Sequence, residues 1–364
     1  MIPFWRKKHQ EEPDKITFTV KNGEILLEKF ITTFDGKRNP IRNFSCEELE
    51  LATNNYDTVN ITMIEVYFKF YKGFLQDRQI SVLKFKSNEE YAYDECINNI
   101  VFASQMCHRH ILKLIGCCIE TRVPILVFES PVKYGTLRDH IHKHHEPHFE
   151  SLSWKQRLKI TTEIANTFSY LHVGFAKPIV YSNMNLSHFL LEEHYVPKLF
   201  DFSFAECIPK GETQIKEAQI RGTMGNMAPE HVMKSVLDEK CDVFGFGLLL
   251  LELLTGQSWL NGFLNSFAKK YGDSSETEDE DIKCSSGTED HHWLWNFVKK
   301  INEDNWFVEV VDPIIVGEGL CPEIEQQMKV FAKLAVKCLF ESGEDRPTMI
   351  DVAKQLRQLY LSAP

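Results

Sequence analysis

Large apolar residues recur every three to four positions in several stretches of the 364-residue chain, a spacing that predicts amphipathic helices. The clearest helix is expected at residues 154–172, where one face carries Ile160, Ile164, Phe168 and Leu171. Another is expected near the end of the chain, with one face formed by Met349, Val352, Leu356 and Leu359. Strands are expected instead at residues 80–84 and at the short apolar run of residues 125–128, so both helices and sheet are expected in the fold.

The first helix is predicted to start at Asn22, because asparagine often caps helices. Three apolar residues follow at helical spacing, namely Leu27, Phe30 and Ile31. Asp35-Gly36 is a typical stop signal. The Asn22-Gly23 pair also suits a tight hairpin turn, because alternating apolar residues precede it: Ile16, Phe18 and Val20. No alternation follows Gly23, so the pattern favours the helix.

The composition indicates a globular chain with a sizeable core, since 43% of the residues are hydrophobic and 26% are charged. The chain has 41 Lys and Arg against 52 Asp and Glu, and its net charge of −11 argues against nucleic acid as a partner. The ten cysteines include no C-x-x-C pair, which favours a reduced, intracellular protein over a disulfide scaffold. The longest apolar run, residues 243–254, contains Glu252 and is too short to span a bilayer, so no transmembrane segment is expected.

Two polar stretches each have a structural and a functional interpretation. Residues 272–292 are acidic and rich in Ser and Thr, which predicts a disordered insertion that is either an inert loop or a site for a basic partner. Residues 140–148 are rich in histidine, but no cysteine flanks them and their spacing is irregular. No metal site is predicted there.

Residues 181–203 carry the most informative pattern, because they resemble the catalytic loop and the metal loop of a protein kinase. In the kinase pattern H-R-D-x-K-x-x-N the aspartate accepts the proton of the substrate hydroxyl, and the asparagine binds a second magnesium. Here Asn183 stands at the aspartate position, and an amide cannot act as a base at neutral pH. His188 stands at the asparagine position, where a hard cation prefers oxygen. Asp201 of D-F-G is kept, whereas Ser203 replaces the glycine.

The kinase glycine-rich loop, whose backbone closes over phosphates, is also changed. Tyr71-Lys72-Gly73 fixes its register, and counting back puts Met63, Glu65 and Phe68 at the glycine positions. The chain has no glycine between Gly36 and Gly73. A phosphate at this place would meet side chains, among them the carboxylate of Glu65.

Lys84 resembles the kinase lysine that contacts the phosphates, so Lys84 and Asp201 are the candidates for a vestigial ATP and magnesium site. A strand-end lysine that extends into solvent explains Lys84 equally well. In kinases the lysine pairs with a glutamate on the next helix, and Asn99 stands at that position here. Asn99 cannot form the ion pair.

Two larger residues are expected to crowd the adenine pocket. Val82 replaces the alanine that roofs it in kinases, and Phe70 replaces the valine that precedes Tyr71. With Leu190 as the floor, these side chains are expected to fill the space of an adenine. No cofactor is therefore expected, while residual ATP binding through Lys84 and Asp201 stays open.

Residues that hold a kinase fold together are retained. Ala228-Pro229-Glu230 resembles the A-P-E motif, and Arg346 stands where the buried partner of Glu230 is expected. Asp242 matches the aspartate that anchors the catalytic loop from the central helix. The residues that hold the fold are present and those that move phosphate are replaced, which favours a protein without kinase activity.

The resemblance runs from about Phe44 to Leu359 and implies an α+β, bilobal protein-kinase fold with a small β-rich N-lobe and a large helical C-lobe. Residues 44–56 resemble the lead-in of plant receptor-like kinases, in which Leu49, Leu51 and Ala52 would pack on the N-lobe. We expect an N-terminal extension at residues 1–43 that includes a short helix, an N-lobe at residues 44–131 and a C-lobe at residues 132–361.

Within the kinases the chain is most similar to the wall-associated-kinase-like cytoplasmic proteins of plants, and in particular to the ZRK pseudokinases. The likeness lies in Lys21-Asn22-Gly23, Gly36-Lys37 and residues 40–45, read as PIRNFS. It implies a cytoplasmic adaptor in plant innate immunity that is located at the plasma membrane when it is part of the receptor complex. The implied partners are the leucine-rich repeats of a coiled-coil NLR immune receptor and a receptor-like cytoplasmic kinase that a bacterial effector has modified.

The activation segment, residues 203–230, is the expected docking element for the modified kinase. Its apolar candidates are Ile215, Ile220, Met224 and Met227. Its candidates for contact with an anionic modification are Lys210, Lys216 and Arg221. The alternative function is a weakly active serine/threonine protein kinase that uses Lys84 and Asp201 with a rearranged base.

Overall fold

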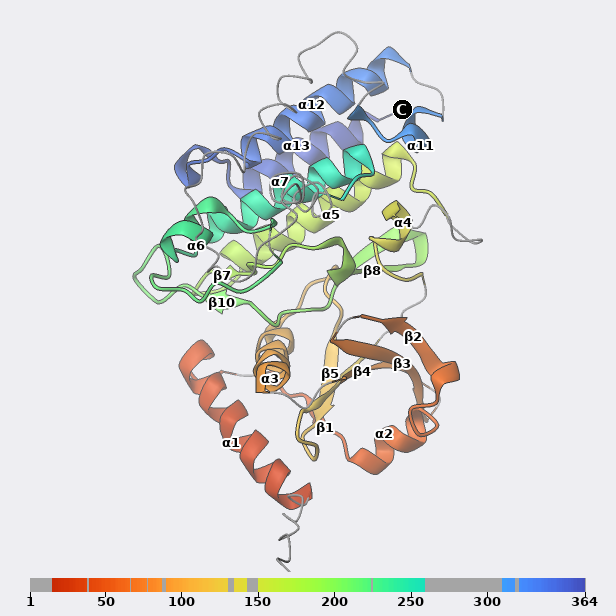
Figure 1. The fold of residues 1–364 in the computed structure, drawn as a ribbon, viewed down its shortest axis with the longest axis vertical. Coiled ribbons are helices and arrows are strands. Elements are labelled where there is room, and N and C mark those ends of the chain that lie inside the picture. The colour runs from red at the N-terminus through yellow and green to blue at the C-terminus, as the bar shows by residue number, and fades with distance from the viewer. Residues whose placement is uncertain are drawn as a thin grey trace, which may run out of the picture. The chain divides into compact units, whose positions relative to one another are not determined.

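The computed structural model describes residues 15–37, 39–65, 67–76, 78–86, 90–129, 134–142, 150–223, 225–258, 310–317 and 321–363. The chain divides into two compact units, coloured in chain order in Figure 1. Unit 1 comprises Met1–Cys107, Leu112–Val132 and Asp201–Ser203. Unit 2 comprises His108–Ile111, Lys133–Phe200 and Phe204–Pro364. The predicted acidic insertion, residues 272–292, and Met224 lie outside the described residues.

Unit 1 is built on a six-stranded sheet with the strand order β1-β5-β6-β4-β3-β2. The strands are β1 (Arg42–Asn43), β2 (Ile61–Ile64), β3 (Phe68–Leu75), β4 (Arg78–Phe85), β5 (Leu114–Cys118) and β6 (Ile125–Phe128). Within this sheet, β1 runs parallel to its neighbour β5, and the other pairs are antiparallel. The close approach of β1 requires the glycine at position 116 of β5, because a Cβ on this residue would lie 2.1 Å from the Arg42 carbonyl oxygen. The strands predicted at residues 80–84 and 125–128 are thus confirmed as parts of β4 and β6.

The helices of unit 1 are α1 (Lys15–Phe34), α2 (Cys46–Ala52) and α3 (Glu90–Gln105), with a 3₁₀ turn at Thr58–Asn60. A capping box starts α2, since the Ser45 side chain accepts from Glu48 N and the Glu48 side chain accepts from Ser45 N. Leu49 of α2 is buried in the core with Phe44, Tyr71, Val82 and Val127. The prediction that Leu51 would also pack there is wrong, because this side chain is 84% exposed.

The first helix is longer than predicted. It starts at Lys15, so the predicted cap Asn22 lies inside α1 and the hairpin alternative is wrong. The Asn22 side chain is fully buried and donates to the carbonyl oxygens of Ile119 and Thr121, at 2.8 and 2.9 Å. Asn22 therefore fastens α1 to the sheet unit, and α1 ends at Asp35-Gly36 as predicted. In Figure 1, α1 runs beside α3.

Unit 2 is mostly helical. Its helices are α4 (Asp139–His142), α5 (Trp154–Val173), α6 (Pro229–Lys234), α7 (Glu239–Thr255), α11 (Pro313–Val316), α12 (Pro322–Cys338) and α13 (Met349–Leu361). Its strands form two pairs, β7 (Ile179–Val180) with β10 (Glu206–Cys207) and β8 (Phe189–Glu192) with β9 (Val196–Leu199). Short 3₁₀ turns lie at Leu186–His188, Glu193–Tyr195 and Gly343–Asp345. The predicted helices at residues 154–172 and 349–359 are confirmed as α5 and α13.

The core of unit 2 forms around α7, whose side chains are buried on nearly every face. Asp238 caps the start of α7, and Gly256 ends it in the left-handed conformation with φ 67°. A buried ion pair joins α5 to the start of α11, since Arg157 Nη2 lies 2.6 Å from Asp312 Oδ2. Within the part of the chain that the structure describes, no helix combines the length and the apolar character needed to cross a membrane.

Candidate functional site

The loop that corresponds to a kinase catalytic loop is anchored by Asp242 of α7. The two carboxylate oxygens of Asp242 accept hydrogen bonds from Tyr181 N at 2.9 Å and from Ser182 N at 2.8 Å. His172 Nε2 lies 2.9 Å from the same carboxylate. Ser182 has a positive φ of 60°, a conformation that costs energy for a non-glycine residue. Asp242 therefore anchors the loop, as predicted from the sequence, and it does so at a residue with a strained backbone conformation.

Asn183 fixes the activation segment. Its Oδ1 accepts hydrogen bonds from both Thr223 N and Thr223 Oγ1, each at 3.2 Å. The Asn183 side chain is buried, with 7% of its surface exposed. Nearby, Asn226 Nδ2 donates to the Met184 carbonyl oxygen at 3.0 Å. The amide at the position of the base thus stabilises local structure.

The other changed positions of the loop also make internal contacts. Ser182 Oγ donates to the Phe204 carbonyl oxygen at 2.9 Å. Asn185 Oδ1 caps the 3₁₀ turn by accepting from Ser187 N and Oγ, both at 2.9 Å. The Tyr181 hydroxyl and His188 Nδ1 share a hydrogen bond of 2.8 Å. The loop is therefore held by its own side chains.

Asp201 belongs to unit 1, where two adjacent asparagines of α3 hold residues 201–203. Asp201 Oδ1 accepts from Asn99 Nδ2 at 3.2 Å, from Ser203 N at 2.9 Å and from Ser203 Oγ at 2.5 Å. Phe202 N donates to Asn99 Oδ1 at 3.2 Å. Asn98 Nδ2 donates to the carbonyl oxygens of Phe202 and Ser203, at 3.1 and 3.0 Å. The buried carboxylate is used to fix the backbone of its own loop.

The side chains at the two magnesium-ligand positions of a kinase, Asp201 and His188, do not fit the magnesium ion that a kinase fold implies. Mg²⁺ requires oxygen ligands in near-octahedral geometry. Asp201 Oδ1 already accepts three hydrogen bonds, and the second ligand position presents the imidazole of His188, which contacts Tyr181.

Replacing Asn99 by alanine is expected to open residues 201–203 locally. The Phe202 amide loses its acceptor, so its hydrogen exchange should be faster by about tenfold, as expected for one lost hydrogen bond. Asn98→Ala is the matched control, because Asn98 contacts only the carbonyl groups of this loop in the hydrogen bonds described above. Unchanged exchange at Phe202 in Asn99→Ala, measured by NMR, would contradict the role of Asn99.

Lys84 lies on the face of the sheet that packs on α2. Its Nζ is 3.9 Å from the ring centroid of Tyr56, and burial lowers the pKa of Lys84. Strand residues alternate between the two faces, so Lys84 shares a face with Val82 and Ile80. Those two residues pack in the core that contains Phe44 and Leu49. Lys84 and Asp201 therefore lie in separate polar surroundings, and no described contact joins them.

The opposite face carries Leu83. Directly paired residues form a row across the sheet: Cys117 with Leu126, Leu126 with Leu83, and Leu83 with Phe70. Paired residues point to the same face. Cys117 acts electrostatically on Cys96 of α3, so this row faces α3, the helix that carries Asn99. Leu83, and not Lys84, therefore faces α3, the helix that carries the glutamate partner of the lysine in kinases.

The same parity corrects the prediction for the adenine pocket. Phe70 pairs with Leu83 and Val82 pairs with Tyr71, so Phe70 and Val82 point to opposite faces and cannot fill one pocket together. Phe70 is fully buried, and the centroid of its ring lies 5.8 Å from the ring centroid of Phe128. In the β2–β3 hairpin, to which Phe70 also belongs, Met63 and Phe68 are buried side chains at positions where kinases have glycine.

The activation segment packs on the loop after α6. Ile215 and Leu237 exchange two backbone hydrogen bonds of 2.8 and 3.0 Å, and Ala218 N donates to the Ser235 carbonyl oxygen at 2.8 Å. Ile220 is 49% exposed, as a docking residue requires. Met227 is only 8% exposed, so its predicted role as a surface contact is wrong. The basic candidates Lys210, Lys216 and Arg221 are exposed.

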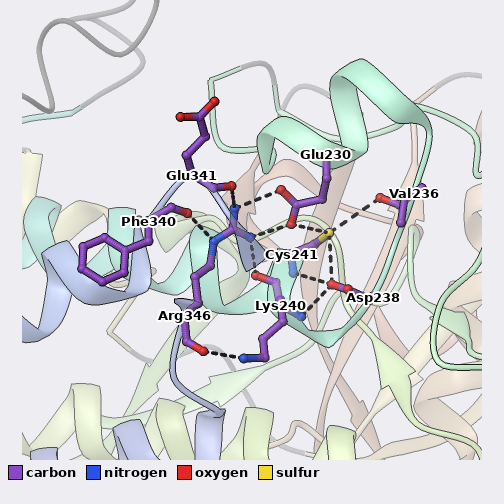
Figure 2. A network of polar contacts seen from close by, with 8 residues as sticks. All are labelled: Glu230, Val236, Asp238, Lys240, Cys241, Phe340, Glu341 and Arg346. Carbon is purple, nitrogen blue, oxygen red and sulfur yellow. Dashed lines mark hydrogen bonds and ion pairs between the residues drawn. The ribbon is translucent and has the colours of Figure 1, made fainter. Parts of the chain in front are cut away.

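The predicted Glu230–Arg346 pair is confirmed, and Figure 2 shows its surroundings. Arg346 Nη1 and Nη2 contact the two Glu230 carboxylate oxygens at 2.5 and 2.9 Å. The guanidinium also donates to the carbonyl oxygens of Phe340, Lys240 and Glu341. Burial alone would raise the pKa of Glu230, but the hydrogen bonds and charge of Arg346 outweigh burial and lower that pKa.

Two residues that contribute to the site were not identified from the sequence. The first is Thr223, whose hydrogen bonds to Asn183 were not predicted. Asn98 was not singled out, although it holds Phe202 and Ser203, and its Oδ1 accepts from Lys29 of α1 at 3.2 Å. The available signal was the pair of adjacent asparagines Asn98-Asn99, because a side-chain amide can bond to both N–H and carbonyl groups of a neighbouring backbone.

Comparison with known proteins agrees with this arrangement. The sequence profile described as protein tyrosine and serine/threonine kinase matches residues 65–289. The chain therefore belongs to the protein kinase family, and its two units are the β-rich and the helical lobe of the bilobal kinase fold.

The relatives narrow the class further. The chain is 34% identical over 353 residues to "Non-functional pseudokinase ZED1" of Arabidopsis thaliana, covering 94% of this chain and 96% of that protein. It is 31% identical over 359 residues both to "Serine/threonine-protein kinase ZRK1" and to "Non-functional pseudokinase ZRK2" of the same plant, covering 97% of this chain and 95% and 93% of those proteins. Two relatives named as non-functional pseudokinases and one named as a protein kinase are thus similar to this chain over nearly its whole length.

Proposed function

We propose that this protein is a catalytically inactive adaptor of plant innate immunity that binds a coiled-coil NLR receptor and recruits an effector-modified receptor-like cytoplasmic kinase. One observation supports the absence of catalysis: the side chains at the catalytic positions form hydrogen bonds that stabilise the local structure. Asn183 holds Thr223, and Asp201 holds Ser203 and Asn99. Leu83 presents no charge toward α3. A catalytic base, a carboxylate available for magnesium and a lysine for the phosphates are therefore all missing from this proposed site.

Phosphoryl transfer by the purified protein is therefore expected to stay at background. The missing base alone costs about 10²–10⁴ in rate, and the other losses act on the same step. Radiolabelled ATP with magnesium or manganese and a generic protein substrate is the measurement. Asn183→Asp should not restore transfer, because it leaves Leu83 and His188 in place.

The weakly active kinase is the outcome that would replace this proposal. Incorporation by the wild-type protein that disappears in Asp201→Ala would assign activity to this chain. A melting-temperature rise on addition of ATP and magnesium that is lost in Lys84→Ala would assign nucleotide binding to Lys84. Neither result is expected, since the Lys84 ammonium lies on the Tyr56 ring.

The surface around the activation segment supports recruitment of a modified kinase. Ile220 lies next to α6, because His231 Nε2 is 3.2 Å from the Gln219 carbonyl oxygen. Two apolar residues of α6 are exposed as well, Val232 at 38% and Met233 at 65%. Exposed basic residues flank them, and these suit an anionic modification: Lys216, Arg221 and Lys234. An apolar patch with a charged rim is a typical protein interaction site.

An exposed stripe on α1 supports binding of the receptor's repeats. Four large apolar residues lie at spacings of four, seven and four positions and are exposed: Ile16 at 73%, Val20 at 55%, Leu27 at 56% and Ile31 at 54%. The buried stripe of the same helix is formed by Asn22, Leu26 and Phe30. A helix with a second apolar face that its own fold leaves uncovered is suited to a protein partner.

Two sets of variants separate the surfaces. Leu27→Glu with Ile31→Glu should abolish co-purification with the leucine-rich repeats of a coiled-coil NLR, whereas Leu51→Glu, an exposed leucine on α2, should not. Ile220→Glu with Met233→Glu should abolish binding of a purified receptor-like cytoplasmic kinase treated with the effector, while receptor binding stays intact. Failure of the wild-type protein to associate with any such receptor would count against the adaptor.

A further inference from the structure

A buried cluster of potential metal ligands lies in unit 1, apart from the catalytic positions. Cys46 opens α2, Cys118 ends β5, and Glu120 follows two residues later. One ligand atom from each residue lies within 4.8 Å of the other two. Cys46 is 7% exposed and Cys118 is fully buried, whereas Glu120 is only partly buried, so the cluster opens to solvent on the glutamate side.

The geometry matches a tetrahedral metal dithiolate. Cys46 Sγ and Cys118 Sγ are 3.6 Å apart. Two thiolates bound to one Zn²⁺ at about 2.3 Å with tetrahedral angles lie about 3.8 Å apart. Glu120 Oε2 accepts from Cys46 N at 2.8 Å, which orients this carboxylate beside the two sulfurs. Ligating carboxylates are commonly held by such a hydrogen bond.

Neighbouring charges suit a metal complex with net negative charge. Two thiolates and one carboxylate around Zn²⁺ carry a net charge of minus one. Lys15 and Lys84 both act electrostatically on Cys46, and Lys15 acts also on Glu120. Without a metal, burial raises the pKa of Cys46 and raises the pKa of Cys118 to about 12, so both sulfurs are thiols in the metal-free protein.

A second cluster of similar composition, Glu230, Asp238 and Cys241, lacks this possibility. The guanidinium of Arg346 already pairs with Glu230 there, as Figure 2 shows, so a cation is in place.

Cys117, which precedes Cys118 in β5, lies on the other face of the sheet, because adjacent strand residues alternate. Cys46, Cys118 and Glu120 therefore stand apart from both.

The geometry points to a Zn²⁺ site formed by Cys46, Cys118 and Glu120, with water completing the tetrahedron. On binding, each thiol loses one proton to solvent, the glutamate binds as a carboxylate, and no oxidation occurs. The metal joins the start of α2 to the end of β5, so it stabilises unit 1 independently of any adaptor role.

Cobalt reports directly on sulfur ligands. Full-length protein is treated with a chelator under reducing conditions and titrated with Co²⁺. We expect one equivalent to produce the sulfur-to-cobalt charge-transfer band and the intense visible bands of tetrahedral cobalt, with Zn²⁺ then displacing the cobalt and raising the melting temperature. Cys46→Ser and Cys118→Ser should each lose the charge-transfer intensity that two thiolates give, and Glu120→Gln should weaken binding while leaving the sulfur band.

Cys117→Ser is the matched control and should bind cobalt as the wild-type protein does. Circular dichroism and the metal-free melting temperature establish that each variant is folded. The proposal is overturned if wild-type protein gives no charge-transfer band, or if folded Cys46→Ser and Cys118→Ser bind Co²⁺ like wild type. The first outcome leaves a hydrogen-bonded thiol pair, and the second places the metal at other cysteines.

Discussion

Replacing Arg346 by methionine is expected to lower the free energy of unfolding by about 3–5 kcal/mol, because removing one member of a buried pair leaves the other charge uncompensated. The Arg346 side chain has no exposed surface, and Glu230 keeps only 16% of its own. The guanidinium also satisfies three carbonyl groups, which lose their donor in the variant. Chemical denaturation of the purified protein at neutral pH measures the loss.

A second variant separates the pair from the packing of the arginine. Glu230→Gln with Arg346→Met removes both charges, so it should be more stable than Arg346→Met alone. The pH dependence gives an independent check. Since the folded pKa of Glu230 is lowered, its contribution is present above the pKa of the unfolded chain and is lost as the pH falls through the folded value. The difference between wild type and Arg346→Met should therefore shrink below about pH 4. A constant difference would contradict the assignment.

Asp242→Ala is expected to cost about 2–6 kcal/mol, since it leaves the buried N–H group of Tyr181 and the partly buried N–H group of Ser182 without an acceptor, at about 1–3 kcal/mol each. His172 loses its partner as well. Ser182, with its strained φ, then keeps only its side-chain hydrogen bond to the Phe204 carbonyl oxygen among the contacts described above, so the loop should relax. Denaturation measures the stability, and hydrogen exchange at Tyr181 and Ser182 measures the loop.

Asp242→Asn is the conservative counterpart. It keeps one acceptor oxygen, so it should recover part of the loss. If both variants unfold like wild type, the anchoring role of Asp242 is wrong. If Asp242→Ala exchanges faster at Tyr181 and Ser182 but not in the Arg346 region, the two anchors act on separate parts of unit 2.

Sequence patterns predicted those features that depend on local spacing or on retained charges. The helical periodicity of residues 154–172 and the apolar strand at 125–128 describe faces that pack in the core. Glu230, Arg346 and Asp242 were identifiable because buried charges need specific partners, so their identities constrain the fold around them. Asn183 was identifiable because its side-chain chemistry excludes a base.

Features that depend on strand register or on distant partners were not accessible from the sequence. Counting residues placed Lys84 at the lysine position, but a difference of one residue transfers a side chain to the other face of a strand, and only the pairing with β3 and β6 decides the face. Asn22 looked like a helix cap because its partners, Ile119 and Thr121, lie almost 100 positions away. The partner of Asn183 was hidden for the same reason.

The position of Lys84 on the α2 face also limits how this chain could regain activity through evolution. Changing Asn183 back to aspartate takes a single substitution, but no single substitution moves an existing lysine across the sheet. Leu83→Lys would bring a new ammonium into a position that is 1% exposed, beside Leu126 and Phe70. Moving Lys84 itself requires an insertion or deletion that shifts β4 by one position, and that shift would turn Val82 and Ile80 out of the core they now form with Phe44 and Leu49. Restoring the aspartate at residue 183 would therefore still leave this fold without an ammonium on the α3 side of β4.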